Sequence, residues 1–210
     1  MTPLSLTDTH TLLEQNTLFL DLRSKEEFAS LHIARSINIP YTSTCGGWIE
    51  ALIPKEHPVV LLLPAISFQG ILEALSKRGF TILGFFVADS IALGEWKTSG
   101  FPTDHIVTTS IKEIYCQIQE NHPPLLIDVR TKEEWDNGHI ESAHHFPLGD
   151  SPLPTFPHTT ALALFCASGY RSAVASSLLK RAGYHTVANV TGGMNAWNDA
   201  GFPTIPRFGY

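Results

Sequence analysis

The side chain in this sequence that is best placed for covalent chemistry is the thiol of Cys166. It follows an apolar run, residues 161–165, and precedes a helix-like segment, residues 172–182. This order predicts a strand, a short turn and a helix, with the thiol near the N-terminus of the helix. Unpaired N–H groups and the helix macrodipole favour a thiolate there, and the thiolate is the nucleophilic form of cysteine. Cys166 is therefore a candidate nucleophile, although a cysteine taken alone is more often an inert core residue.

The turn after Cys166 has the composition of an anion cradle. Gly169 allows backbone conformations that are closed to other residues, so that successive N–H groups can point inward. Arg171 adds a permanent positive charge at the rim. We therefore expect an anionic substrate or intermediate to be held by Ala167, Ser168, Gly169, Tyr170, Arg171 and Ser172.

These residues also carry a family resemblance. The pattern Cys-x-x-Gly-x-Arg-Ser after an apolar strand resembles the active-site loop of the rhodanese family of sulfurtransferases. The resemblance implies that the Cys166 thiolate takes sulfur from a donor, holds it as a persulfide and passes it to an acceptor. Three further blocks resemble the rest of that domain: Leu125 to Arg130 with Glu133-Glu134-Trp135, then Gly138-His139-Ile140 with Pro147, and Asn189 to Trp197 with Gly201-Phe202-Pro203.

The chain contains an internal repeat. Residues 21–40 align without a gap with residues 128–147, and eight of the twenty positions are identical. Further along, residues 100–102 match residues 201–203. The sequence thus predicts two tandem domains, residues 1–103 and residues 104–210, because composition alone does not produce such a match.

The first copy lacks the chemistry of the second. Opposite Cys166 it has the stretch Leu62 to Gly70, which contains neither Cys nor Arg. Its Pro64 also removes one N–H donor. We therefore expect residues 1–103 to be catalytically silent. The resemblance to two-domain rhodaneses implies that this copy is a structural partner that helps to wall the site.

Apolar runs alternate with helical patterns in both halves. Runs such as residues 59–63 and 161–165 show no alternation of polar side chains, which is typical of parallel strands buried on both faces. The sequence predicts an α/β fold: two tandem rhodanese-like domains, each a parallel sheet with helices on both faces. Ligands of such sheets bind at the carboxyl ends of strands, where Cys166 falls.

Asp128 and Arg130 are further candidates, since they could tune the site from behind the cradle. Their matches Asp21 and Arg23 persist in the copy without the cysteine, so a structural role is favoured. The same reasoning makes His139 structural. The histidines lack the spacing of metal ligands, and we expect neither a metal nor another cofactor.

The other two cysteines are expected to play no part in catalysis. Cys45 lies in a loop-like stretch, which predicts a surface thiol, whereas Cys116 is predicted to pack within a helix over residues 111–118. Ser110 and Glu113 form a plausible capping box for that helix. An odd number of cysteines with irregular spacing argues against a disulfide framework and for a reducing, cytoplasmic location.

Charge and hydropathy limit the partners. A net charge of −6 and a pI of about 5.9 argue against nucleic acid. The sequence has no apolar stretch of the roughly 18 residues that span a bilayer, so no membrane partner is expected. The chain is long enough for two domains, each with its own core.

Three classes of function remain open. The first is a sulfurtransferase that moves sulfane sulfur from a small anion, such as thiosulfate, to a thiol, cyanide or a protein thiol. The second is a protein-persulfide carrier or a noncatalytic interaction module. The third is a phosphatase or arsenate reductase, which we disfavour because four residues separate Cys166 from Arg171. The related oxyanion loops have five there, and a shorter loop suits a single sulfur atom.

Overall fold

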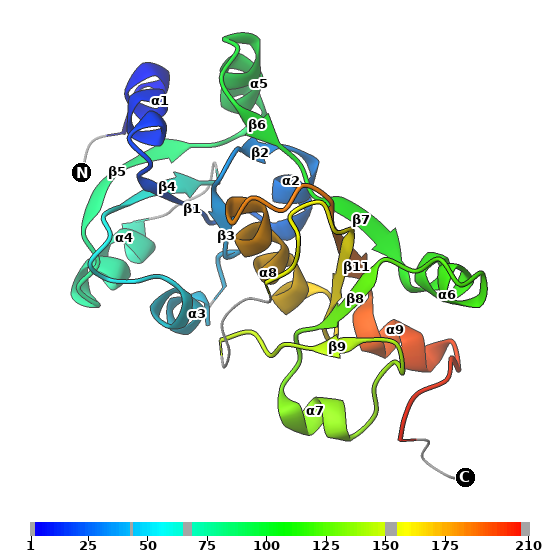
Figure 1. Cartoon of the computed structure of the whole chain (residues 1–210). Helices are drawn as coiled ribbons and strands as arrows, with labels where there is room; N and C mark the ends of the chain where they lie inside the picture. Colours follow the sequence, from blue (N-terminus) through cyan, green and yellow to red (C-terminus); the bar gives the residue numbers. More distant parts are fainter. Residues whose placement is uncertain (1–2, 43, 65–68, 150–154, 207–210) are drawn as a thin grey trace. The chain divides into compact units, whose positions relative to one another are not determined.

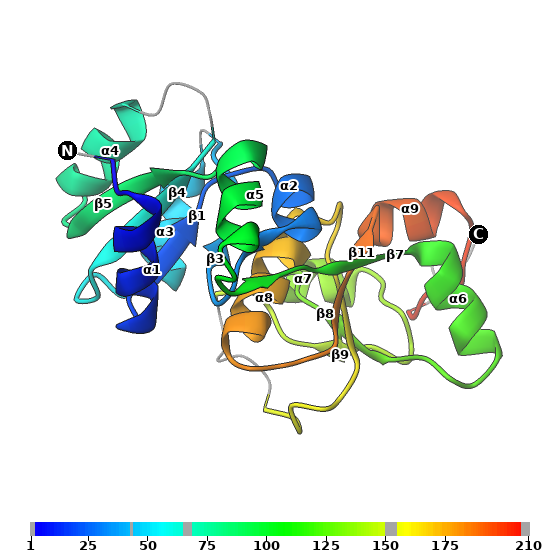
Figure 2. The same cartoon turned by 90° about the horizontal axis from the view of Figure 1, so that it is seen from above.

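The chain divides into two compact units, Met1–His105 and Ile106–Tyr210, each with its own sheet and helices (Figures 1 and 2). The computed structural model describes residues 3–42, 44–64, 69–149 and 155–206. Among these residues, no helix is long and apolar enough to cross a membrane.

The first unit is built around a four-stranded parallel sheet of order β3-β1-β4-β5, and a short antiparallel pair, β2 and β6, accompanies it. Its elements are α1 (Leu6–Glu14), β1 (Leu18–Asp21), α2 (Lys25–Ser30), β2 (His32–Ile33), β3 (Ile37–Asn38), α3 (Cys45–Leu52), β4 (Val59–Leu63), α4 (Gln69–Lys77), β5 (Ile82–Val87), α5 (Ser90–Thr98) and β6 (Thr103–Asp104).

The second unit has a five-stranded parallel sheet of order β7-β11-β10-β8-β9. The predicted α/β class is therefore confirmed. The elements of the second unit are β7 (Val107–Ser110), α6 (Ile111–Gln119), β8 (Leu125–Asp128), α7 (Lys132–Asp136), β9 (His144–His145), β10 (Leu162–Phe165), α8 (Tyr170–Arg181), β11 (Val187–Thr191) and α9 (Gly193–Asp199).

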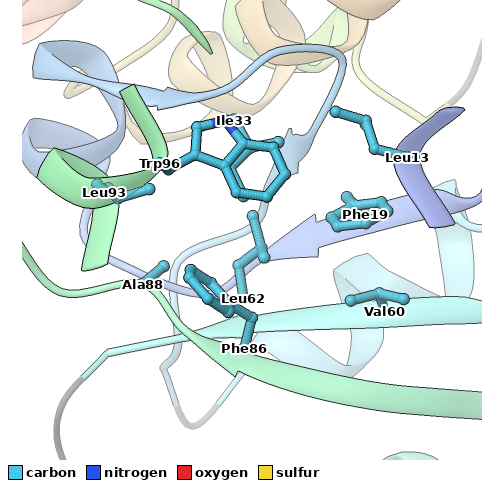
Figure 3. Packing of buried hydrophobic residues seen from close by; sticks show 9 residues of the cluster. All are labelled: Leu13, Phe19, Ile33, Val60, Leu62, Phe86, Ala88, Leu93 and Trp96. Carbon is cyan, nitrogen blue, oxygen red and sulfur yellow. The ribbon is translucent and has the colours of Figure 1, made fainter. Parts of the chain in front are cut away.

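Each unit packs a tryptophan at the centre of an apolar cluster. In the first, Trp96 of α5 lies with Phe19 and Leu62 of the sheet (Figure 3). In the second, Trp197 of α9 occupies the corresponding place. Each indole N–H donates to a proline carbonyl six residues further on, at 3.0 Å in both cases. This shared detail extends the sequence repeat to the packing of the cores.

The strand registers show which residue of the first unit corresponds to Cys166. The last rung of the β1–β4 ladder ends on Leu62, and the last rung of the β8–β10 ladder ends on Phe165. The next residue is Leu63 in the first unit and Cys166 in the second, so a fully buried leucine stands where the thiol is. Most of the predicted first-copy loop, residues 65–68, lies outside the described residues.

The two other cysteines differ from expectation. Cys45 is not a surface thiol: it begins α3 and is buried, on the same face as the buried Ile49 four residues later. Cys116 does not pack, because α6 turns its apolar stripe, which includes Ile114, toward the core and leaves Cys116 exposed. The predicted capping box of α6 is confirmed, with Ser110 accepting the N–H of Glu113 at 3.2 Å.

Candidate active site

Cys166 lies between β10 and α8, at the carboxyl end of a central strand. Its side chain is 1% exposed and belongs to an apolar cluster with Leu164 and Ala175. Helix α8 begins at Tyr170, two residues before the predicted start, because Gly169 takes the left-handed conformation, with φ at 94°, and caps the helix. The thiol therefore lies in the loop just before the N-terminus of α8.

The sulfur accepts hydrogen bonds from the cradle. The backbone N–H of Gly169 points to Sγ at an N···S distance of 3.1 Å, and the Ser172 hydroxyl lies 3.6 Å from it. Ser172 is fully buried, Ala167 and Tyr170 are half-buried, and Ser168 is exposed. Donors converging on a sulfur at a helix N-terminus stabilise negative charge on that atom.

Backbone hydrogen bonds from the first residues of α9 hold the loop that follows Cys166. The N–H of Met194 donates to the carbonyl of Cys166 at 2.8 Å, and the N–H of Asn195 donates to the carbonyl of Ala167 at 3.0 Å. These bonds require Gly193, because a Cβ there would lie 2.1 Å from the Cys166 carbonyl oxygen. The glycine pair at 192–193 thus belongs to the architecture of the cradle, and the first unit has Asp89 as the cap of its corresponding helix.

Asn189 is a site residue that sequence reasoning did not single out. It lies on β11, is 5% exposed, and its Nδ2 donates to the carbonyl of Gly169 at 3.3 Å. Its Oδ1 has no hydrogen-bond partner among the described residues. A polar side chain inside a buried parallel strand was the available signal, since such strands are normally apolar. In the register of the first unit the matching residue is Phe85.

We predict that Asn189→Leu slows sulfur uptake by Cys166 but has little effect on the stability of the fold. The substitution removes one buried hydrogen bond and one unsatisfied oxygen, so the free energy of unfolding changes by less than about 1 kcal/mol. The Gly169 carbonyl loses its restraint, and sulfur uptake by Cys166 slows by about threefold to tenfold. Urea denaturation and single-turnover mass spectrometry measure the two effects. An unchanged rate of uptake would show that Asn189 does not position the loop.

Arg171 is not the free rim charge that the sequence suggested. Its guanidinium forms a bidentate ion pair with Glu134, with both N···O distances at 2.6 Å. The hydrogen bond from Arg171 lowers the pKa of Glu134 to about 2, with a further contribution from the N–H of Thr131. The same pair, together with the nearby charge of Cys166, raises the pKa of Arg171.

Glu134 joins α7 to the cradle. Besides binding Arg171, its carboxylate accepts the N–H of Thr131 at 3.0 Å and completes the capping box of α7. In the first unit Glu27 caps α2 in the same way. The sequence indicates Glu134 only as part of a family motif, since nothing local to it predicts a partner 37 residues away.

We predict that the Glu134–Arg171 pair adds stability that depends on pH. Because the pKa of Glu134 falls from 4.5 to about 2 on folding, its contribution is complete above about pH 4.5 and is lost as the pH falls toward 2. The difference in urea midpoint between the wild type and Glu134→Gln therefore shrinks over that range. Glu133→Gln, on the same helix and exposed, is the matched control. A constant difference down to pH 2 would contradict the assignment.

Asp128 and Arg130 brace the strand end behind the cradle. Arg130 Nη2 lies 2.6 Å from Asp128 Oδ2 and also donates to the carbonyl of Gly138 at 2.9 Å. The first unit has the same buried pair in Asp21 and Arg23, where burial raises the pKa of Asp21. These contacts match the structural role favoured from the repeat.

The histidines make local contacts. His139 Nδ1 lies 3.0 Å from the carbonyl of Trp135, and its ring stacks on that indole. In the first unit His32 Nδ1 lies 2.7 Å from the carbonyl of Phe28. Within the described ranges, no group of three or more His, Cys, Asp and Glu side chains is arranged to hold a metal ion.

Comparison with known proteins gives the family. The Rhodanese-like domain model matches residues 110–200. The putative sulfurtransferase YtwF of Bacillus subtilis is 38% identical over 94 residues, which are 44% of this chain and 87% of that protein. The chain belongs to the rhodanese family. Its relatives include sulfurtransferases. The matched region, residues 110–200, contains Cys166 and every residue of its cradle.

Other relatives are longer than the matched region, and a solved structure is also similar. An uncharacterized Synechocystis protein, slr1261, is 35% identical over 92 residues, 42% of this chain, and the chain spans 51% of its length. For two longer mycobacterial relatives that share is 24%. The crystal structure of a rhodanese-like domain protein from Staphylococcus aureus is 33% identical, with a TM-score of 0.41, covering 44% of this chain and 91% of that one.

Proposed function

We propose that the protein is a sulfurtransferase that moves sulfane sulfur from a small anionic donor to a thiophilic acceptor through a persulfide on Cys166. The observation that carries the proposal is the position of Sγ. It accepts the N–H of Gly169, the N-cap of α8, at 3.1 Å. The rhodanese family supplies the reaction class.

With thiosulfate as donor, the steps balance as follows. The Cys166 thiolate attacks the outer sulfur, a Cys S–S bond forms, the S–S bond of thiosulfate breaks, and sulfite leaves with the electron pair of that bond. The persulfide anion Cys–S–S⁻ remains. Cyanide then attacks the outer sulfur, and thiocyanate leaves as Cys166 returns to the thiolate. A thiol acceptor follows the same course and becomes a persulfide itself.

The cradle is suited to hold the charge that this reaction develops. Gly169 and Ser172 supply donors near Sγ at the N-terminus of α8, where the helix dipole favours negative charge. Arg171 adds positive charge, but Glu134 compensates most of it. The backbone therefore contributes more to stabilising the outer sulfur than the arginine does, and Arg171 chiefly holds the loop against α7.

We also propose that residues 1–103 are a silent copy of the catalytic domain, residues 104–210. Leu63 takes the position of Cys166, and a leucine side chain cannot carry sulfur. The first unit retains the buried ion pair between Asp21 and Arg23, although it lacks the thiol. A copy that keeps its fold and loses its nucleophile fits a supporting or partner-binding role.

Intact mass tests the proposed function. After exposure to thiosulfate, the protein is expected to gain about 32 Da, the mass of one sulfur, and to lose it on addition of cyanide with release of thiocyanate. Mercaptopyruvate in a parallel experiment distinguishes donors. Hydrolysis of aryl phosphates without a sulfur adduct from either donor would contradict the proposal and favour oxyanion chemistry.

A further inference from the structure

The second unit has a pocket at the end of α6, apart from the cradle. Its volume is about 170 Å³. The walls come from α6 at Ile118, from Trp197 of α9 and from the segment that contains Ile205. Glu141 and Ser142 complete the rim. Nothing in the proposed sulfur transfer uses this pocket.

The first unit shows what the corresponding position can hold. In the sequence repeat, Arg35 matches Ser142. Arg35 Nη2 donates to the carbonyl of Leu13 at 3.2 Å, at the end of α1, and lies 3.7 Å from a carboxylate oxygen of Glu14. Arg35 thus reaches from its own loop to the carboxyl end of α1.

The acceptor at that helix end is preserved in the second unit. Leu13 matches Ile118, because each carbonyl accepts the N–H of an asparagine three residues later, at 3.0 Å and 3.1 Å. Both asparagines, Asn16 and Asn121, have positive φ angles, 57° and 58°. Ser142 has a much shorter side chain, without the guanidinium that Arg35 brings to the matching carbonyl. The second unit therefore keeps the acceptor and lacks the arginine.

The electrostatics of the pocket favour a cation. It lies at the carboxyl end of α6, where the helix dipole is negative, and the last turn of α6 has no basic residue. The exposed side chain of Glu141 adds a carboxylate at the rim. The half-buried side chains of Ile118 and Ile205 line the pocket and can cover an aliphatic stem while the charged group meets the carbonyl and carboxylate.

We propose that this pocket binds the arginine side chain of a partner polypeptide. A guanidinium is planar and has several N–H donors, so it can reach the Ile118 carbonyl and the Glu141 carboxylate at once. It thereby takes the place that Arg35 fills from within the first unit. An uncharged side chain of similar length lacks the complementary charge and binds more weakly.

NMR titration of the full chain with acetyl-Gly-Arg-Gly-amide tests this proposal. We expect a saturable shift of the Trp197 indole resonance, and at least about tenfold weaker binding of acetyl-Gly-Gln-Gly-amide. Glu141→Gln is expected to weaken the arginine peptide by about twofold to fivefold. Ser142→Arg, which copies the first unit, is expected to abolish binding, whereas Ser142→Ala retains it as the matched control.

The two Ser142 variants also distinguish a failure of this proposal from a failure of the proposed sulfur transfer. Residue 142 lies outside the cradle, so both substitutions at this position are expected to preserve persulfide formation on Cys166. Absence of saturable binding, or equal binding to wild type and Ser142→Arg, would overturn the proposal.

Discussion

The Cys166→Ser variant is expected to gain no sulfur from thiosulfate or mercaptopyruvate and to lose sulfur transfer by roughly 10³-fold or more. A serine hydroxyl is far less nucleophilic than a thiolate at neutral pH and cannot form a persulfide. The substitution is nearly isosteric, and the Gly169 N–H can still donate to the new oxygen. The fold should therefore survive, which circular dichroism and urea denaturation verify.

The other cysteines provide controls for this result. Cys116 is exposed on α6, so Cys116→Ser is expected to leave both stability and sulfur transfer unchanged. Cys45 is buried, and Cys45→Ser places a hydroxyl in the core; stability falls modestly while the sulfur adduct still forms. A 32 Da adduct on the Cys166→Ser protein would refute the assignment of the nucleophile.

The second large effect is expected for Gly193→Ala. The added methyl would meet the Cys166 carbonyl oxygen at 2.1 Å and the Ala167 carbonyl oxygen at 2.8 Å, both parts of the backbone. Neither atom can move without breaking the hydrogen bonds from Met194 and Asn195. We expect a loss of about 2 to 4 kcal/mol in the free energy of unfolding and a large fall in persulfide formation.

Gly201→Ala is the matched control for this steric argument. Gly201 also has a positive φ, 68°, but a Cβ there meets no atom within 4 Å. The control therefore carries only the backbone cost of the left-handed conformation, about 1 to 2 kcal/mol, and leaves sulfur uptake intact. Urea denaturation and intact mass after thiosulfate are measured on both. Equal effects in the two variants would show that the clash with the Cys166 carbonyl is unimportant.

Several features of the fold and site follow from local sequence patterns. The apolar run before Cys166, the glycine at 169 and the helix after it predicted a strand, turn and helix because these signals depend on neighbouring residues. The repeat of Asp-x-Arg at 21 and 128 likewise indicated a brace shared by both copies, and the structure shows that ion pair in each unit. The capping boxes are readable for the same reason, since their partners lie three residues apart.

The contacts that shape the cradle were decided by the tertiary structure. Glu134 and Arg171 are 37 residues apart, and Asn189 reaches back 20 residues to Gly169. Such pairings depend on the strand order, which brings β8, β10 and β11 side by side. Sequence periodicity does not specify which side chains then meet.

Burial of individual side chains was also settled by packing. Cys45 was expected at the surface and Cys116 in the core, and the structure reverses both. A thiol is small enough to suit either environment, so its own chemistry does not determine its place. That place is set by which face of α3 or α6 turns toward the sheet, and this depends on the larger apolar side chains around it. The sequence by itself thus predicted the candidate nucleophile, the turn and the repeat, whereas the tertiary structure determined how the loop is held.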